Sequence, residues 1–282
     1  MAADRPTAAQ LAHVPGLEHG APALRVQRLP GGTVNEVYRV DSARGSFVLR
    51  LDGPQWRRPG VDRARELALH RCAAAAGLAP RIVGAWPEAG VLVTEFLAGQ
   101  CWLDAHFGDA SALVRLGETL QLLHALAPPA SPAVAPFDPL PIAMHYATLA
   151  AGTPTLDAQG RTQLLATLEA ALQRLAAARA PACIIHGDLV AGNLLQTGAR
   201  LWLLDWEYAQ LADPLFDVAC VLAYHPAAWP QRGLLLAAAG LETPAARERL
   251  ADAIHVYQAL TWLWHQARGE SLPWPEPPRP AG

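Results

Sequence analysis

Residues 184–217 read IIHGDLVAGNLLQTGARLWLLDWEYAQLADPLFD, and the alternation of apolar and polar segments in this stretch sets the architecture of the chain. Two short apolar runs, 182–185 and 201–204, enclose a polar loop. Gln-Thr-Gly-Ala at 196–199 precedes the second run and predicts a hairpin turn, in which the glycine supplies a positive φ. The stretch therefore predicts two short strands with polar loops at their ends.

Three polar side chains of this stretch, Asp188, Asn193 and Asp205, have the types and the spacing that phosphoryl transfer requires. We expect them to emerge close together from strand ends. An aspartate must accept the proton of the attacking hydroxyl, while an amide oxygen and a second carboxylate hold Mg²⁺ against nucleotide phosphates. Asp188 precedes Asn193 by five positions, as in the protein-kinase catalytic loop, and Asp205 follows Asp188 by 17. A lone loop aspartate is usually a turn or cap residue, but the complete pattern favours a catalytic site.

The loop and the D-W-E segment that follows it resemble the aminoglycoside phosphotransferase and choline kinase superfamily. The signature of that superfamily is H-x-D-x-x-x-x-N and then a hydrophobic strand ending in D-x-E, and residues 186–193 and 205–207 match it. The sequence LDWEYA at 204–209 is most similar to the choline/ethanolamine and thiamine kinase branch. The resemblance implies ATP and Mg²⁺ as cofactors, with Asn193 and Asp205 as the metal ligands.

The resemblance also implies a role for other polar residues of the stretch. Asp188 is the catalytic residue that orients and deprotonates the acceptor hydroxyl. His186 is a second catalytic-loop residue, which stiffens the loop by hydrogen bonding. Glu207 supports the metal site through water or accepts a hydrogen bond from the substrate. Asp217 matches a family position that braces the catalytic loop from behind.

The N-terminal part predicts a strand pair, 24–29 and 36–40, around the turn PGGTVN at 30–35. A glycine turn between two strands can lie over nucleotide phosphates with its amides facing them. This turn lacks the G-x-G-x-x-G pattern of protein kinases, so an ordinary hairpin is the alternative. By resemblance, the phosphate-loop positions are Gly32, Thr33 and Asn35.

Residues 46–51 predict a strand with one apolar face and place Arg50 on the opposite face. Kinases carry a basic residue on this strand that holds the α- and β-phosphates. All 22 basic residues of the chain are arginines, so Arg50 is the candidate, and a guanidinium can grip phosphate bidentately. An ordinary surface arginine is the alternative.

Residues 62–77 predict a helix that Asp62 caps and Gly77 ends. Glu66 lies about one turn into this helix. The resemblance implies that Glu66 pairs with Arg50 and orients it toward the nucleotide. An exposed glutamate in an arginine-bearing helix is the alternative.

The resemblance implies an α+β, protein-kinase-like fold of two lobes. Two further strands, 79–86 and 90–96, end at a segment that resembles the hinge between kinase lobes. We therefore divide the chain into an N-terminal nucleotide-binding lobe, residues 1–96, with an antiparallel sheet and one helix, and a C-terminal catalytic and substrate lobe, residues 97–282. The second lobe is predicted to be mostly helical, with helices at 109–127, 162–179 and 244–268, another from residue 213, and a proline-rich loop at 128–141.

Aromatic residues gather toward the C-terminus, and the last predicted helix carries Tyr257 and Trp262. Aromatic side chains on a helix are usually core residues. They also form cages that hold organic cations by cation–π attraction, as in choline kinases, so Tyr257 and Trp262 are candidate substrate residues. An aminoglycoside-modifying enzyme would favour an acidic pocket, whereas the few acids in the C-terminal third favour a small, singly charged substrate.

The composition limits the classes of partner and the cellular compartment that we expect for this protein. With 52% hydrophobic residues among 282, the chain can bury a substantial core. A net charge of −3 without a basic run argues against nucleic acid and anionic membranes as partners, and no apolar run reaches the ~18 residues that a membrane span needs. Four cysteines without a C-x-x-C pair, and no apolar signal-peptide core, favour the reducing cytoplasm.

These observations support three hypotheses. The first is a kinase that moves the γ-phosphate of ATP to the hydroxyl of a choline-, ethanolamine- or thiamine-type alcohol. The second keeps this chemistry, with an aminoglycoside or amino sugar as acceptor. The third is a nucleotide-binding pseudokinase that acts as a partner protein, which the presence of Asp188, Asn193 and Asp205 disfavours. The sequence leaves the acceptor, the choice of ATP or GTP, and the oligomeric state open.

Overall fold

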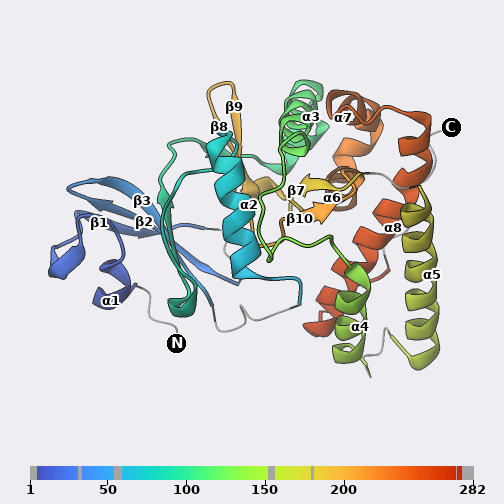
Figure 1. The fold of residues 1–282 in the computed structure, drawn as a ribbon, viewed down its shortest axis with the longest axis horizontal. Helices are drawn as coiled ribbons and strands as arrows, with labels where there is room; N and C mark the ends of the chain where they lie inside the picture. Colours follow the sequence, from blue (N-terminus) through green and yellow to red (C-terminus); the bar gives the residue numbers. More distant parts are fainter. Residues whose placement is uncertain are drawn as a thin grey trace.

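A computed structural model describes residues 5–30, 34–53, 59–151, 156–178, 181–270 and 272–274. Figure 1 shows a sheet at one end of the molecule, a group of helices at the other, and helix α2 between them. The predicted α+β class is confirmed. Two of the predicted phosphate-loop positions, Gly32 and Thr33, lie outside the described residues.

The small lobe is built on an antiparallel sheet of five strands in the order β1-β2-β3-β5-β4. Phe47, Leu49 and Leu51 of β3 pack in a core that also contains Tyr38. Because side chains alternate along a strand, Arg50 lies on the other face of the sheet. The strands are β1 Arg25–Arg28, β2 Glu36–Ser42, β3 Gly45–Leu51, β4 Ile82–Trp86 and β5 Val91–Glu95, and a short helix α1, Ala8–Leu11, precedes them.

Helix α2, Arg63–Ala75, joins this sheet to the rest of the molecule. It begins after Asp62, whose carboxylate accepts the N–H groups of Ala64 and Arg65, and it ends before Gly77, which has φ +72°. The predicted helix and its cap are confirmed. Helix α2 contacts β4 of the small lobe and β10, Gln210–Ala212, of the large lobe. A residue on α2 can therefore act on both lobes.

The predicted hairpin lies in the large lobe. β8, Leu194–Thr197, pairs with β9, Arg200–Leu203, and Gly198 in the turn has φ +60°. β6, Gln100–Cys101, follows the connection from β5 and pairs with β8. The predicted division between residues 96 and 97 falls in this connection and stays a prediction.

A second pair of short strands flanks residues 186–209, which contain the polar loop and the D-W-E segment. β7, Cys183–Ile185, pairs antiparallel with β10, Gln210–Ala212. β10 is not predicted from the sequence, because three residues show no periodicity. The pairing brings the start of the polar loop close to the end of the D-W-E segment, which places their side chains together.

The large lobe is mostly helical, as predicted. Helix α5 begins four residues before its predicted start, because Asp157 caps it by accepting the N–H of Gly160 at 2.7 Å. Helix α4 begins inside the predicted proline-rich loop, where Asp138 caps it and Pro139 occupies the first turn, a position that tolerates proline. The helices are α3 Ala110–His124, α4 Pro139–Leu149, α5 Ala158–Ala177, α6 Leu215–Tyr224, α7 Arg232–Ala238 and α8 Pro244–Ala267.

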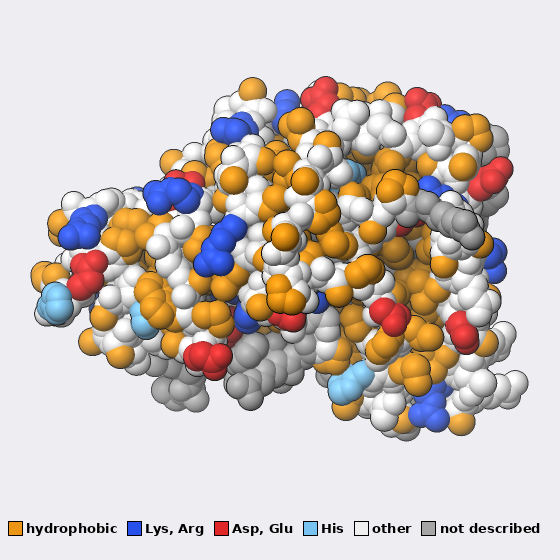
Figure 2. All heavy atoms as spheres, in the orientation of Figure 1, with side chains coloured by type: hydrophobic (Ala, Val, Ile, Leu, Met, Phe, Trp, Pro, Cys, Tyr) orange, Lys and Arg blue, Asp and Glu red, His pale blue; other side chains and the backbone are white. Residues whose placement is uncertain are grey.

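Helix α8 is the centre of the helical packing. It lies against α4, α5 and α6 (Figure 1), and it carries buried side chains along its length. No helix in the described parts of the chain combines the length and the apolar character needed to cross a bilayer. On the face drawn in Figure 2, the basic side chains of the described residues are scattered among hydrophobic and acidic ones.

The packing of α3 against α7 depends on the absence of a side chain at Gly117. A Cβ at this position would lie 2.5 Å from the Cβ of Ala238 and 2.9 Å from the carbonyl oxygen of Leu235. We expect Gly117→Ala to lower the free energy of unfolding by about 1–3 kcal/mol, because the two helices must move apart.

Gly233→Ala in α7 is the matched control, because nothing lies within 4 Å of its added Cβ. This variant should gain up to about 1 kcal/mol from the higher helix propensity of alanine. Chemical denaturation of both variants measures the difference. Equal stability of the two variants would contradict the close approach of α3 and α7.

Candidate active site

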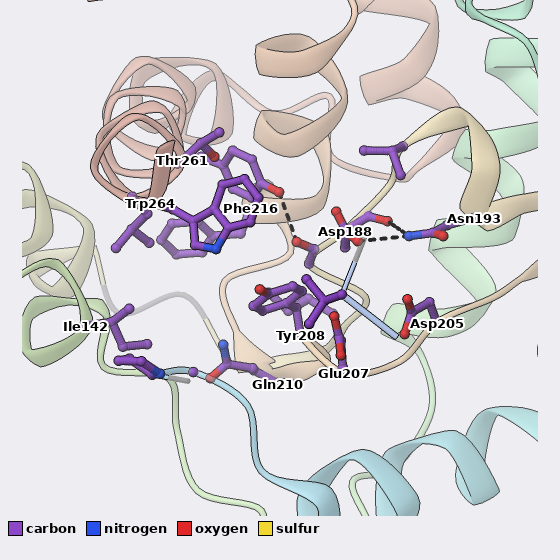
Figure 3. Close-up of a pocket in the computed structure, with 18 of the residues that line it drawn as sticks. Ile142, Asp188, Asn193, Asp205, Glu207, Tyr208, Gln210, Phe216, Thr261 and Trp264 are labelled. Atoms are coloured by element: carbon purple, nitrogen blue, oxygen red, sulfur yellow. Dashed lines mark hydrogen bonds between the residues drawn. The ribbon is translucent and has the colours of Figure 1, made fainter. Parts of the chain in front are cut away.

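Six of the twelve predicted site residues line one cavity of about 410 Å³ between the small lobe, the polar loop and helices α4, α6 and α8. We call residues 186–193 the catalytic loop and residues 205–207 the D-W-E segment. Figure 3 shows their polar side chains on one side of the cavity and side chains of α8 on the other. The predicted residues that line the cavity are Asn35, Asp188, Asn193, Asp205, Glu207 and Tyr257.

His186 holds the catalytic loop from within the protein. Its ring is fully buried and lies edge-on against Trp206, with the ring centres 5.0 Å apart. Nε2 donates to the carbonyl oxygen of Leu204 at 2.9 Å, and Nδ1 accepts the N–H of Asp188 at 3.3 Å. Burial lowers the pKa of His186, although Asp217 opposes this shift. The neutral ring that these two bonds require is therefore the favoured form at neutral pH.

Asp217 of α6 holds the backbone of the same loop. One of its carboxylate oxygens accepts the N–H of Gly187 at 2.9 Å, and both oxygens lie 3.1 Å from the backbone nitrogen of His186. His124 donates to the carboxylate through Nε2 at 2.9 Å. A fully buried carboxylate without such partners would be costly. The structure therefore contains the bracing contact that the resemblance implies for Asp217.

Asp188 and Asn193 form a direct pair at the edge of the cavity. The side-chain nitrogen of Asn193 donates to the carboxylate and to the carbonyl oxygen of Asp188, both at 2.9 Å (Figure 3). This pair fixes the Asp188 carboxylate. Because the amide nitrogen faces Asp188, the amide oxygen of Asn193 faces away from it.

Asp205 has an unusual backbone conformation, with φ +59°. Residues other than glycine rarely adopt this left-handed region, although aspartate does so more readily than most, and strained residues cluster at functional sites. Burial and the neighbouring Glu207 raise the pKa of Asp205, and Arg50, at 3.4 Å, opposes the shift. A carboxylate whose charge is disfavoured in this way would be stabilised by a bound cation.

The pairing predicted between Arg50 and Glu66 is present in the structure. The two side chains are buried and form two hydrogen bonds, one of them from Nη2 at 3.0 Å. Burial disfavours the charge of Arg50, but Glu66 and Asp205 outweigh it and raise the pKa of the guanidinium. Glu66 thus holds Arg50 beside Asp205. Arg50 and Glu66 are not themselves among the described residues that line the cavity.

Aromatic side chains form the opposite wall of the cavity. The rings of Tyr224 and Tyr257 meet at right angles to one another, with centres 5.7 Å apart, and both line the cavity. Trp264 also lines it, and Arg268 lies 4.7 Å from the centre of the Trp264 ring. Arg268 therefore already occupies one face of the Trp264 indole in a cation–π contact.

The expectation that Trp262 meets the substrate needs correction. Trp262 is buried, donates its indole N–H to the carbonyl oxygen of Leu272 at 2.9 Å, and packs against Trp274. It is not among the described residues that line the cavity. Helical periodicity explains the difference, because Tyr257 and Trp264 are seven residues apart and share a face of α8, whereas Trp262 points to the core.

Several other lining residues are not predicted from the sequence. Helical spacing from Tyr257 could have identified the cavity residues of α8. The remaining residues come from segments whose arrangement depends on tertiary packing. The lining residues of both kinds include Phe137, Ile142, Tyr208, Gln210, Phe216, Thr261, Trp264 and His265.

A model of the phosphotransferase enzyme family matches residues 25–267, which include both lobes and the whole cavity lining of the large lobe. The chain belongs to this family. Its membership confirms the predicted superfamily resemblance and identifies the chain as a phosphotransferase enzyme.

Solved structures agree with this assignment. A choline/ethanolamine kinase family protein from Mesorhizobium loti is 30% identical to this phosphotransferase, with a TM-score of 0.74 over 93% of this chain and 86% of that one. Choline kinase LicA from Streptococcus pneumoniae also has a TM-score of 0.74, at 20% identity over 90% and 88% of the two chains. An ADP-bound aminoglycoside phosphotransferase has a TM-score of 0.61 at 15% identity, over 89% and 95%. The predicted kinase-like fold is confirmed.

A curated relative matches over a short stretch only. Protein LicA of Haemophilus influenzae is 51% identical to the phosphotransferase over 37 residues. This match covers 13% of this chain and 14% of LicA, so it supports a local resemblance and no conclusion about the whole protein.

Tyr257 connects the aromatic wall to the catalytic loop, because its hydroxyl donates to the carbonyl oxygen of Gly187 at 3.0 Å. Burial raises the pKa of Tyr257, so the hydroxyl remains a donor. We expect Tyr257→Phe to lower kcat about tenfold, the effect of losing ~1.4 kcal/mol of loop positioning. The KM for the acceptor should stay within about twofold, because the ring remains.

Tyr38→Phe is the control for this measurement, because its hydroxyl also has a partner, Glu36 at 3.0 Å, but lies in the core of the small lobe. Its kcat should match that of the wild type. An increased acceptor KM with unchanged kcat in Tyr257→Phe would show that the hydroxyl contacts the acceptor and does not position the loop.

Proposed function

We propose that this phosphotransferase uses Mg²⁺ and ATP to phosphorylate the hydroxyl of a small alcohol with one cationic centre, of the choline, ethanolamine or thiamine type. One observation carries the proposal: Asp188 lies at one end of a cavity whose other wall consists of aromatic rings. The likeness to a choline/ethanolamine kinase family protein at 30% identity supports this acceptor class.

Asp188 is suited to orient the acceptor and to take its proton. Its carboxylate faces the cavity and is fixed by Asn193. As the acceptor oxygen bonds to the γ-phosphorus, its proton passes to Asp188 and the bond to the β-phosphate oxygen breaks, releasing ADP. His186 and Asp217 serve this step by fixing the loop, without contact to the reacting atoms.

The oxygen donors of the site fit Mg²⁺ bound together with nucleotide phosphates. The Asn193 amide oxygen and the Asp205 carboxylate are hard donors, which Mg²⁺ prefers. In the described part of the chain, no three His, Cys, Asp or Glu side chains form a metal site by themselves, which suits an ion that takes most ligands from phosphates and water. When bound, Mg²⁺ neutralises the charge of the reacting phosphates.

The small lobe supplies the remaining nucleotide contacts in this proposal. Arg50, oriented by Glu66, holds the phosphates, and Asn35 lies at the end of the phosphate loop and lines the cavity. Residues 1–96 thus bind the nucleotide, and residues 97–282 supply the catalytic groups and the acceptor cavity. We place the reaction in the cytoplasm, which is consistent with four free cysteines.

The charges around the cavity favour an acceptor with one positive charge. Among the described residues, no arginine lines it, so an anionic acceptor would lack a partner. The acids that line it, Asp188, Asp205 and Glu207, all lie at the catalytic end. The opposite end is aromatic and aliphatic, which suits one ammonium group held by π faces.

The two other hypotheses explain less of the geometry. An aminoglycoside carries several ammonium groups, and the described residues at the aromatic end include no carboxylate to meet them. A pseudokinase would have no need for the paired Asp188 and Asn193 beside Asp205. The aminoglycoside or amino-sugar acceptor therefore stays the second candidate, and the partner-protein role the third.

Two alanine variants separate the catalytic role from the metal-binding role. Asp188→Ala should abolish turnover, by about 10³-fold or more, while Mg·ATP affinity stays within about twofold, because Asp188 acts on the acceptor. Asp205→Ala should lose the Mg²⁺-dependent part of ATP binding. Calorimetry with and without Mg²⁺, together with a turnover assay, measures both effects. Comparable turnover in Asp188→Ala would refute its role.

The acceptor class is tested by Mg·ATP consumption with a panel of choline, ethanolamine, thiamine, amino sugars and aminoglycosides. We expect turnover above the acceptor-free rate with one of the first three. Trp264→Ala should then raise the acceptor KM about tenfold, since a desolvated cation–π contact contributes up to ~2 kcal/mol. The control, Trp86→Ala at the exposed edge of the small sheet, should leave this KM unchanged. Turnover of an aminoglycoside alone would overturn the proposed acceptor.

A further inference from the structure

A second buried arginine, Arg63, lies beside Arg50 at the start of α2. Its Nε and Nη2 atoms donate to the two carboxylate oxygens of Asp52 at 3.1 and 2.7 Å. Its Nη1 atom donates to Glu66 at 2.6 Å. This bidentate contact with Asp52, which follows β3 directly, fixes the plane of the guanidinium.

The same Nη1 atom reaches across to the large lobe. It lies 3.3 Å from Oε2 of Glu207 in the D-W-E segment. Asn35 donates to the same oxygen at 3.0 Å. Two groups from the small lobe therefore hold one oxygen of Glu207, which orients its carboxylate where it lines the cavity.

Arg50 and Arg63 each form an ion pair with a different acid of the D-W-E segment. Arg50 contacts Asp205 at 3.4 Å, Arg63 contacts Glu207 at 3.3 Å, and both arginines bind Oε2 of Glu66. Each acid of the segment is thus held by one arginine of the small lobe, and Glu66 links the two arginines. A change at Arg63 can therefore reach the metal-binding end of the site through Glu207.

The charge balance of the buried cluster gives a second reason why position 63 needs an arginine. Among the described residues, Asp52, Glu66, Asp205 and Glu207 lie together around two guanidinium groups, those of Arg50 and Arg63. Four carboxylates with one arginine would repel one another strongly in a buried cluster. A lysine could supply the charge, but its single nitrogen cannot grip Asp52 with two parallel bonds while it contacts Glu66 and Glu207.

We propose that Arg63 is a positioning residue for phosphoryl transfer, which orients Glu207 and joins the D-W-E segment to the small lobe. Arg63 need not touch substrate or nucleotide for this role. The inference rests on the proposed function, because it concerns the same site. Its signature is energetic coupling between Arg63 and Glu207 in the binding of Mg·ATP.

The test is a double-mutant cycle with Arg63→Lys and Glu207→Gln. Arg63→Lys should weaken Mg·ATP binding about fivefold or more in the wild-type background and less than about twofold in the Glu207→Gln background. Calorimetry gives these affinities without any acceptor. A failed acceptor panel would therefore count against the proposed function and leave this test intact. With a working acceptor, kcat should show the same coupling.

Arg65→Lys is the matched control in the same helix. Arg65 donates to the carbonyl oxygens of Ala209, at 3.0 Å, and of Gly60, so it also ties α2 to the large lobe but without contact to Glu207. Its effect on Mg·ATP affinity should be the same in both backgrounds. The melting temperature of every variant shows whether a loss of Mg·ATP affinity comes from lower stability of the fold or from the lost interaction between Arg63 and Glu207.

Two results would overturn the proposal. The first is an Arg63→Lys effect of equal size with and without the Glu207 carboxylate. The second is full retention of affinity in Arg63→Lys, which would mean that charge alone suffices. A loss of affinity in Arg63→Lys that disappears in the Glu207→Gln background supports the proposed role.

Discussion

The buried carboxylate of Asp217 is the contact on which the catalytic loop depends. The loop contains only one short 3₁₀ turn, η4 at Ala191–Asn193, so most of its backbone groups need partners elsewhere. Asp217 accepts two of its N–H groups, and Tyr257 donates to the carbonyl oxygen of Gly187. Gly187 itself has φ +76°, and an added Cβ would lie 2.7 Å from the carbonyl oxygen of Tyr208. The residue before Asp188 is therefore held on both sides and has no room for a side chain.

The second constraint is the imbalance of charge between the lobes. The small lobe offers Arg50 and Arg63 to the acids of the D-W-E segment, and these contacts span the interface between the lobes. Burial and, after it, the neighbouring Glu207 still raise the pKa of Asp205, so the arginines do not fully offset the cost of its charge. The same charges that join the lobes would therefore also serve the proposed binding of Mg²⁺ and nucleotide phosphates.

Much of this arrangement can be predicted from local signals. Asp62 before an alanine-rich run predicts α2, and the turn around Gly198 predicts the β8–β9 hairpin, because caps and turns depend on neighbouring residues. The catalytic loop is predictable because its chemistry fixes residue types at fixed spacing. Trp264 is predictable only once Tyr257 is known to face the cavity, because the two residues share a face of α8 by their spacing. The role of Arg63 is not predictable, because it depends on contacts between segments far apart in the sequence, about which local patterns carry no information.

The choice of an arginine, Arg50, on the strand proposed to hold the phosphates also affects the chemical reactivity of the site. A guanidinium keeps its proton at any pH that the protein survives, whereas an amine in the same place could lose it. The basic group proposed to hold the nucleotide therefore cannot act as a nucleophile or set an alkaline limit on binding. Since all 22 basic side chains are arginines, amine-reactive acylating reagents find no side-chain target in this protein. Its nucleotide site is inert to a class of covalent modification that marks lysine-based kinases.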